Sequence, residues 1–121
     1  MSLAILVSFD IDGTLEAGDP PGPITMEMVR RAAAHGCIIG SSSDRPLPVQ
    51  QGIWDRHDIK VSFVSAKHQL VDVKARFAAE AYYHIGDTEL DQQFALDAGF
   101  HFLWMDDGHT EPWLDERMTQ N

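Results

Sequence analysis

The sequence contains a single cysteine, Cys37, among its 121 residues. One cysteine excludes an internal disulfide and any zinc site built from several cysteines. No apolar run approaches the roughly 18 residues that a membrane-spanning helix needs. The first residues carry no positive charge ahead of their short apolar stretch, so they do not resemble a secretory signal. We therefore expect a protein of a reducing, cytoplasmic compartment.

Basic residues are also scarce. Nine lysines and arginines stand against nineteen aspartates and glutamates, which gives a formal net charge of −10. A field of that sign repels nucleic acid and anionic membrane surfaces, so we expect neither as a partner. The length predicts one domain over residues 1–121, with a core over 3–106 and a polar tail over 107–121.

Short apolar runs alternate with stretches of helical spacing along the chain. The first run, residues 3–9, is apolar at both alternating positions, as in a strand that is buried on both faces. The alternation predicts an α/β fold with one doubly wound parallel sheet of about five strands and helices on both faces. The expected strands cover residues 3–9, 37–42, 60–66, 82–86 and 100–105, and the expected helices cover 25–35, 46–57, 68–80 and 89–98.

Polar residues gather at the ends of the expected strands, where the carboxyl edge of a parallel sheet binds ligands. Four aspartates at this edge cannot all stay ionised without a cation, and oxygen ligands favour a hard ion such as Mg²⁺. The six histidines show no paired metal-ligand spacing, so we expect them at the surface or at the edge of the core. The strand ends carry Asp10-Ile11-Asp12-Gly13-Thr14, Ser41-Ser42-Ser43-Asp44-Arg45, Lys67 and Gly86-Asp87-Thr88-Glu89-Leu90-Asp91.

The run FDIDGTL, followed later by GDTELD, resembles the motifs of the haloacid dehalogenase superfamily, in particular its aspartate-nucleophile phosphatases. The similarity spans about Leu3 to Asp106, and each of the four family motifs has a candidate in the right order. The resemblance implies a Mg²⁺-dependent enzyme that hydrolyses a phosphomonoester through an aspartyl-phosphate. The alternative is a binding or regulatory module that keeps the fold without useful turnover.

The resemblance assigns roles to the residues of the first motif. Asp10 would be the nucleophile, and Asp12 would protonate the leaving oxygen and then activate water. Gly13 would let the chain turn sharply, Thr14 would bond the backbone there, and both would contact the phosphate or the backbone around it. The metal would be held by Asp10, the Asp12 carbonyl and an aspartate of the last motif.

The later motifs would complete this site. Asp87 would bind Mg²⁺, and Asp91 would either bind the metal through water or hold the lysine of the third motif. That lysine would offset charge on the phosphoryl group, and we expect Lys67 in this role. Lys74 lies farther along the same helix and is expected to be solvated.

Three adjacent serines compete to bind the phosphoryl oxygens. Ser43 fits the family triplet best, with Ser41 in reserve, although Asp44 stands where the family usually has glycine or asparagine. Arg45 would either bind a substrate anion or pair with the aspartate before it.

The sequence leaves no room for the cap domain that many family members carry. Only residues 16–23 separate the first motif from the next helix. An uncovered site excludes water poorly. We therefore expect either a large substrate such as a phosphorylated protein, or a small phosphate ester whose site is covered by another subunit of a homo-oligomer.

Overall fold

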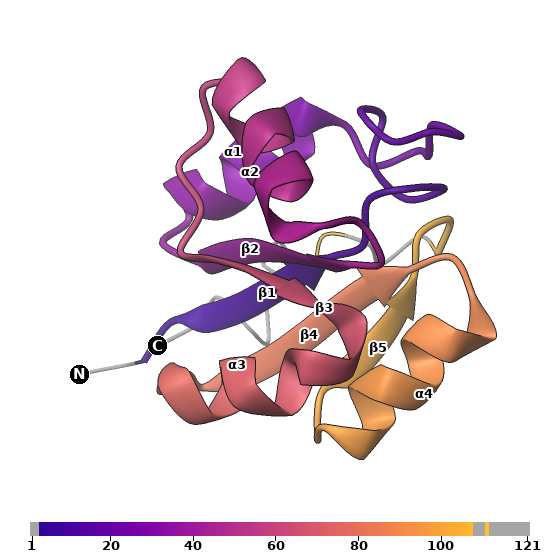
Figure 1. Ribbon diagram of the computed structural model, residues 1–121. Helices are drawn as coiled ribbons and strands as arrows, with labels where there is room; N and C mark the ends of the chain where they lie inside the picture. Colours follow the sequence, from indigo (N-terminus) through magenta and orange to yellow (C-terminus); the bar gives the residue numbers. More distant parts are fainter. Residues whose placement is uncertain (1–2, 108–110, 112–121) are drawn as a thin grey trace.

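The computed structural model describes residues 3–107 and 111, so most of the tail expected over 107–121 lies outside the described residues. One sheet holds five parallel strands in the order β3-β2-β1-β4-β5, as predicted (Figure 1). The strands are β1 (Ile5–Phe9), β2 (Ile38–Ser43), β3 (Phe63–Ala66), β4 (Ala81–Gly86) and β5 (His101–Trp104). The helices are α1 (Met26–Ala34), α2 (Leu47–Arg56), α3 (Leu70–Arg76) and α4 (Glu89–Asp97), and a 3₁₀ turn, η1 (Lys67–Gln69), precedes α3.

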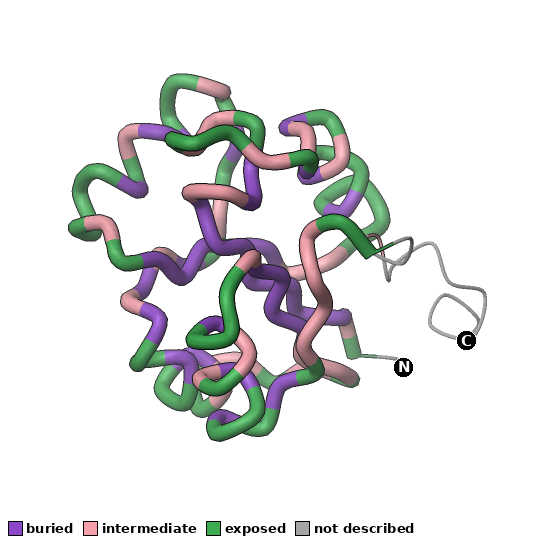
Figure 2. The backbone as a smooth tube through the Cα atoms, turned by 90° about the vertical axis from the view of Figure 1, so that its right-hand side faces the viewer, coloured by how far each residue is buried: buried purple, intermediate pink, exposed green. Residues whose placement is uncertain are grey.

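Helices cover both faces of the sheet. In Figure 1, α1 and α2 lie on one side of the strands, and α3 and α4 lie on the other. All five residues of β1 are buried, as the apolar run predicted, and Figure 2 shows buried residues along the centre of the molecule. Alternation sends Val7 toward α1 and α2 and sends Leu6 toward α3 and α4. Ser8 and Asp10 follow Leu6 at steps of two, and therefore lie on the α3 and α4 side.

The order of the strands creates a crevice at their carboxyl ends. The chain runs from β1 outward through β2 to β3, and then crosses back to place β4 on the other side of β1. The direction of winding thus reverses between β1 and β4, which is where sheets of this kind bind ligands. Asp10 directly follows β1, and Asp87 directly follows β4. The topology therefore brings the first and last acidic motifs to one place.

Local signals set the ends of the first helix. The Thr25 side chain accepts a hydrogen bond from the Met28 N–H at the start of α1. Gly36, with φ +87°, lies just past its end and adopts a backbone conformation that favours glycine. These residues explain why the predicted boundaries of this helix agree with the structure within one residue.

The third helix ends earlier than expected. It was predicted over 68–80 but stops at Arg76. Beyond it, the Tyr82 hydroxyl donates to the Phe77 carbonyl and accepts from the Ala79 N–H. A side chain from the next strand thus satisfies backbone groups that a longer helix would have paired internally, and this tertiary contact is invisible to local helical spacing.

No cap domain interrupts the described residues, and residues 16–23 form only a short flap after β1. Among the described residues, no helix combines the length and the apolar character needed to cross a membrane.

Candidate active site

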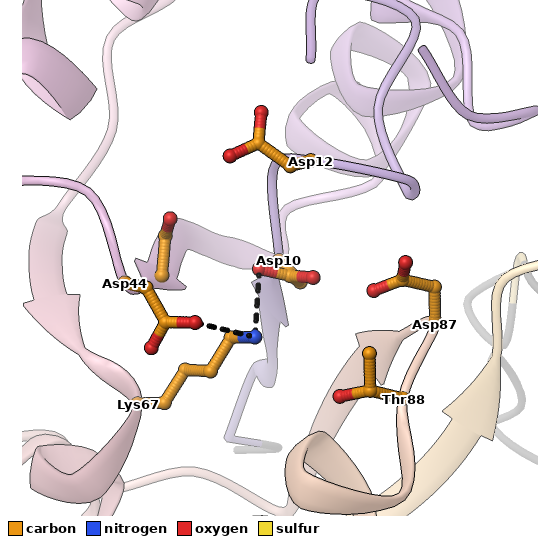
Figure 3. Close-up of a pocket in the computed structure, with 7 residues that line it drawn as sticks. Asp10, Asp12, Asp44, Lys67, Asp87 and Thr88 are labelled. Atoms are coloured by element: carbon orange, nitrogen blue, oxygen red, sulfur yellow. Dashed lines mark ion pairs between the residues drawn. The ribbon is translucent and has the colours of Figure 1, made fainter. Parts of the chain in front are cut away.

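A pocket opens at the carboxyl edge of the sheet, beside the point where the strand order reverses. It has a volume of about 160 Å³. That is smaller than the roughly 300–1,000 Å³ of a typical pocket for a whole small ligand, so it has room for a reacting group with the remainder outside. Its lining side chains come from all the predicted motifs (Figure 3). They are Asp10, Asp12, Ser43, Asp44, Lys67, Asp87 and Thr88.

Asp10 lies at the floor of this pocket. Its side chain is 3% exposed, and its Oδ1 lies 3.5 Å from the Lys67 ammonium. Burial, the negative charge of Asp91 and a hydrogen bond with Asp87 together raise the pKa of Asp10 to about 8, although Lys67 acts in the opposite direction. Burial, the largest of these causes, disfavours the charged form of this carboxyl group.

The raised pKa of Asp10 gives a prediction for stability in the absence of metal. Between its ordinary value of 3.8 and about 8, the folded protein keeps a proton that the unfolded chain has lost. The contribution of Asp10 to stability is therefore present at low pH and is lost as the pH rises toward 8. In EDTA, we expect the Tm of the wild type to fall relative to that of Asp10→Asn between pH 5 and pH 8. Parallel melting curves across this range would contradict the assignment.

Lys67 joins three carboxylates at one side of the pocket. Its Nζ lies 3.5 Å from Asp10 and 3.4 Å from Asp44 (Figure 3). The same atom lies 3.3 Å from Asp91, and the Lys67 side chain is 7% exposed. Burial lowers the pKa of Lys67, but the charges of these three aspartates outweigh burial and raise it. Lys74, the other candidate, is outside the pocket and donates to the Gly99 carbonyl.

Asp91 is fully buried and forms an ion pair with Lys67. Its Oδ1 lies 2.9 Å from Nε2 of His84, while its Oδ2 accepts from the Thr88 hydroxyl at 2.7 Å and from Lys67 at 3.3 Å. Burial alone would raise the pKa of Asp91, but His84, Thr88 and Lys67 together lower it to about 2. Of the two expected roles of Asp91, this geometry favours the one that holds the lysine, because both carboxylate oxygens already have partners.

Three carboxylates could share a cation. Asp10, Asp87 and Asp91 each offer one oxygen, and these atoms lie within 4.8 Å of one another. Carboxylate oxygens suit a hard divalent ion, and four aspartates line the pocket beside a single lysine. The residues present therefore fit Mg²⁺, for which Asp10 and Asp87 would be direct ligands. The Asp12 carbonyl, the third expected ligand, belongs to the same turn after β1.

Gly13 makes room for Asp87. Its φ is +75°, and a Cβ added there would lie 1.9 Å from Oδ2 of Asp87. We expect Gly13→Ala to displace this carboxylate and to weaken Mg²⁺ binding at least tenfold by calorimetry. Gly36→Ala is the matched control, because Gly36 also has a positive φ but has no atom within 4 Å of the added Cβ. It should cost only backbone strain, about 1 kcal/mol, and leave Mg²⁺ affinity unchanged. Equal loss of affinity in both variants would contradict this role.

Asp12 is paired with Arg45 at the mouth of the pocket. Arg45 donates from Nε and Nη2 to both oxygens of Asp12, at 2.8 to 3.2 Å, and the Asp19 N–H donates to Oδ1 at 2.7 Å. The hydrogen bonds from Arg45 lower the pKa of Asp12 despite partial burial. Arg45 therefore pairs with Asp12 and not with the aspartate before it, and Asp12 must leave this pair before it can act as an acid.

The serines of β2 point in different directions. Ser43 lines the pocket, and its Oγ accepts from the Arg45 N–H at 3.0 Å. Ser41 is buried, donates to Gln50 at 2.7 Å and accepts from the Trp54 indole at 3.0 Å. The structure thus places Ser43 at the pocket and corrects the reserve assignment of Ser41, whose hydroxyl is turned toward α2.

Two other predicted residues lie behind the pocket and do not line it. Thr14 is fully buried, with its hydroxyl 3.4 Å from Oδ2 of Asp10. Gly13 lies directly against the Asp87 side chain, as described above. Both were expected to contact the phosphate or the backbone around it, and the structure instead places them where they support the two carboxylates.

His84 was expected at the surface or at the edge of the core, and this prediction is wrong, because its side chain is fully buried. Its Nδ1 lies 3.0 Å from Oγ of Ser8. A buried row of hydroxyls, here called the serine row, continues from it across the sheet and ends at the Ala66 carbonyl. The serine row consists of Ser8, Ser42 and Ser65. The signal was available in the sequence, because alternate residues of a central parallel strand are buried on both faces.

The chain from Asp91 through His84 and the serine row has acceptors at both ends, a carboxylate and a carbonyl. Each hydroxyl brings one proton, so the serine hydroxyls donate one to the next toward the Ala66 carbonyl.

Gln50 is the second residue that the sequence did not reveal. It is fully buried in α2, and its amide nitrogen donates to the carbonyls of Arg45 and Ser65, at 2.8 and 2.9 Å. It thus ties the segment that carries Ser43 to the strand that leads into Lys67.

Comparison of the sequence with protein-family models finds no family that matches. A search of curated proteins finds no match either.

Proposed function

We propose that the protein is a cytoplasmic, Mg²⁺-dependent phosphatase of the haloacid dehalogenase superfamily, which hydrolyses a phosphomonoester through a phosphorylated Asp10. One observation carries the proposal. A single small pocket joins a buried carboxylate, Asp10, with an ammonium, a serine hydroxyl and a further carboxylate, from Lys67, Ser43 and Asp87. A nucleophile, a group that offsets phosphoryl charge and ligands for a hard cation are what phosphoryl transfer requires.

The first chemical step would form a bond between a carboxylate oxygen of Asp10 and phosphorus, while the bond from phosphorus to the ester oxygen breaks. Asp12 would give its proton to the leaving oxygen. Lys67, 3.5 Å from Asp10, would offset the charge on the phosphoryl oxygens, and the Ser43 hydroxyl would donate to one of them. Bound Mg²⁺ would neutralise the remaining phosphoryl charge.

The second step would return Asp10 to its starting state. Water attacks phosphorus, Asp12 takes up a proton of that water, and the bond between phosphorus and the Asp10 oxygen breaks to release inorganic phosphate. Both steps require Asp12 to leave Arg45. Arg45 is then available for an anionic group of the substrate, which was one of its two expected roles.

The small volume of the pocket and the lack of a cap in the part of the chain that the structure describes also indicate which kinds of substrate could bind. Its volume of about 160 Å³ suits a phosphoryl group, and no cap covers it among the described residues. The remainder of the substrate would therefore lie outside the pocket. A phosphorylated protein meets this condition directly, and a small phosphate ester meets it when a second copy of the chain covers the site.

The first experiment is hydrolysis of p-nitrophenyl phosphate with Mg²⁺ and with EDTA. We expect turnover in Mg²⁺ that falls more than tenfold in EDTA, because without the cation no group offsets the charge between Asp87 and the phosphate. Adding excess Mg²⁺ back should restore the rate and controls for damage by the chelator. Turnover that is equal in Mg²⁺ and EDTA would contradict the proposed metal dependence.

A second candidate function is a binding or regulatory module without turnover. The observation that favours it is the pairing of Asp12 with Arg45, which lowers the pKa of the one carboxyl group expected to donate a proton. This candidate predicts that Mg²⁺ and inorganic phosphate bind, as measured by calorimetry, while p-nitrophenyl phosphate stays intact.

A further inference from the structure

A buried chain of hydrogen bonds begins at the Lys67 ammonium and ends at the carbonyl of Ala66. The Lys67 ammonium lies 3.3 Å from Oδ2 of Asp91, and Oδ1 of the same carboxylate lies 2.9 Å from Nε2 of His84. From Nδ1 of His84, the chain crosses the sheet through the serine row to the carbonyl of Ala66, the residue before Lys67. The side chain of Lys67 and the backbone of the residue before it thus belong to the same network.

The contact with His84 bears on the orientation of the Asp91 carboxylate. Thr88 and Lys67 both bind Oδ2, and His84 is the hydrogen-bond partner of Oδ1. Asp91 and His84 are both fully buried, so solvent does not replace a lost partner. Without His84, Oδ1 would be a buried acceptor with no donor, and such a group is costly to leave unpaired. The carboxylate would then rotate toward the other donors and carry Lys67 away from Asp10.

We propose that His84, held in turn by Ser8, is a positioning residue that orients Asp91 and thereby holds the Lys67 ammonium beside Asp10. The role of Lys67 in catalysis rests on the proposed phosphatase function, whereas the orientation of Asp91 and Lys67 does not. His84 touches neither the pocket nor a reacting atom, because the residues that line the pocket do not include it.

The first test follows the ammonium group of Lys67 by ¹H–¹⁵N NMR. Proton exchange hides exposed lysine ammonium groups, while a buried and hydrogen-bonded one remains visible. The chain has only three lysines, so single Lys→Arg variants at positions 60, 67 and 74 assign every signal. We expect a Lys67 signal in the wild type that His84→Leu abolishes and His84→Gln retains, because the glutamine amide can still donate to Asp91.

A matched control separates positioning from a general loss of stability. Val73→Ala removes buried apolar volume on the same face of the sheet without touching the chain. It should retain the Lys67 signal at a temperature where it is folded. Ser8→Ala, which removes the support of His84 but leaves the ring in place, should weaken the signal less than His84→Leu, and it provides the test if His84→Leu does not fold.

Turnover of p-nitrophenyl phosphate provides the second readout. We expect His84→Leu to lower kcat about tenfold or more with a smaller change in KM, and His84→Gln to recover part of that loss. A missing Lys67 signal in the wild type, or a His84→Leu variant that matches Val73→Ala in both signal and kcat, would overturn the proposal. If the wild type turns over no substrate, the phosphatase function fails, and the NMR comparison still decides the role of His84.

Discussion

Asp10→Asn is expected to lower kcat for p-nitrophenyl phosphate in the presence of Mg²⁺ by at least about 10³-fold, because an amide cannot form the acyl phosphate. The carboxylate that it removes is the buried one at the floor of the pocket, 3.5 Å from the Lys67 ammonium. The variant should still fold, since an uncharged amide replaces a carboxyl group whose charged form is disfavoured by burial. Initial rates measured beside a melting curve test both statements.

Asp72→Asn is the matched control for this substitution. Asp72 is an exposed aspartate in α3 and does not line the pocket, so the same chemical change there should leave kcat unchanged. Trapping the phosphorylated protein in acid and finding the modified residue by mass spectrometry would add direct evidence. Turnover retained in Asp10→Asn, or phosphate found on another residue, would place the nucleophile elsewhere.

Lys67→Ala is expected to have the second largest effect, a loss in kcat of about 10²-fold or more. The Lys67 ammonium serves three aspartates at once, and its removal leaves Asp91 fully buried without that cation. Removing one partner of a buried ion pair typically costs about 3–5 kcal/mol. We expect a loss of stability at the lower end of this range, because the carboxyl group of Asp10 keeps its proton up to about pH 8 and needs no cation there.

Lys74→Ala is the control that the chain itself offers. Lys74 lies on α3 and donates to the Gly99 carbonyl, away from the pocket. Its removal should leave kcat within about twofold of the wild type and should change stability by less than about 1 kcal/mol. The opposite ranking of the two lysine variants, by steady-state rates and chemical denaturation, would show that the wrong lysine has been placed in the site.

The residues that follow the strands are the part of the site that the sequence predicts best. Asp10, Asp87 and Lys67 each directly follow an apolar run, and a parallel sheet gathers such positions at one edge whatever the side chains are. That rule requires only the order of the elements, which local spacing reveals. The pocket that contains these three residues was therefore predictable before any contact was known.

The pairing of individual side chains, in contrast, could not be predicted from the sequence. Arg45 was expected to bind a substrate anion or the aspartate before it, and the structure pairs it instead with Asp12, which lies 33 positions away in the sequence. Asp91 likewise had two roles that its position on the helix could not separate. Choices of this kind depend on distances of a few ångströms between elements, and no periodicity within one element contains that information.

The sequence by itself determined the α/β class, the alternation of elements and the edge at which the acidic residues meet, because spacing along the chain and burial of apolar faces fix all three. Only the tertiary structure decided that Ser41 turns away from the pocket, that Tyr82 ends α3 early and that His84 lies buried against Asp91. Each of these outcomes comes from a hydrogen bond between different elements. Such bonds form only after the sheet and its helices have brought distant polar groups together in a space that excludes water.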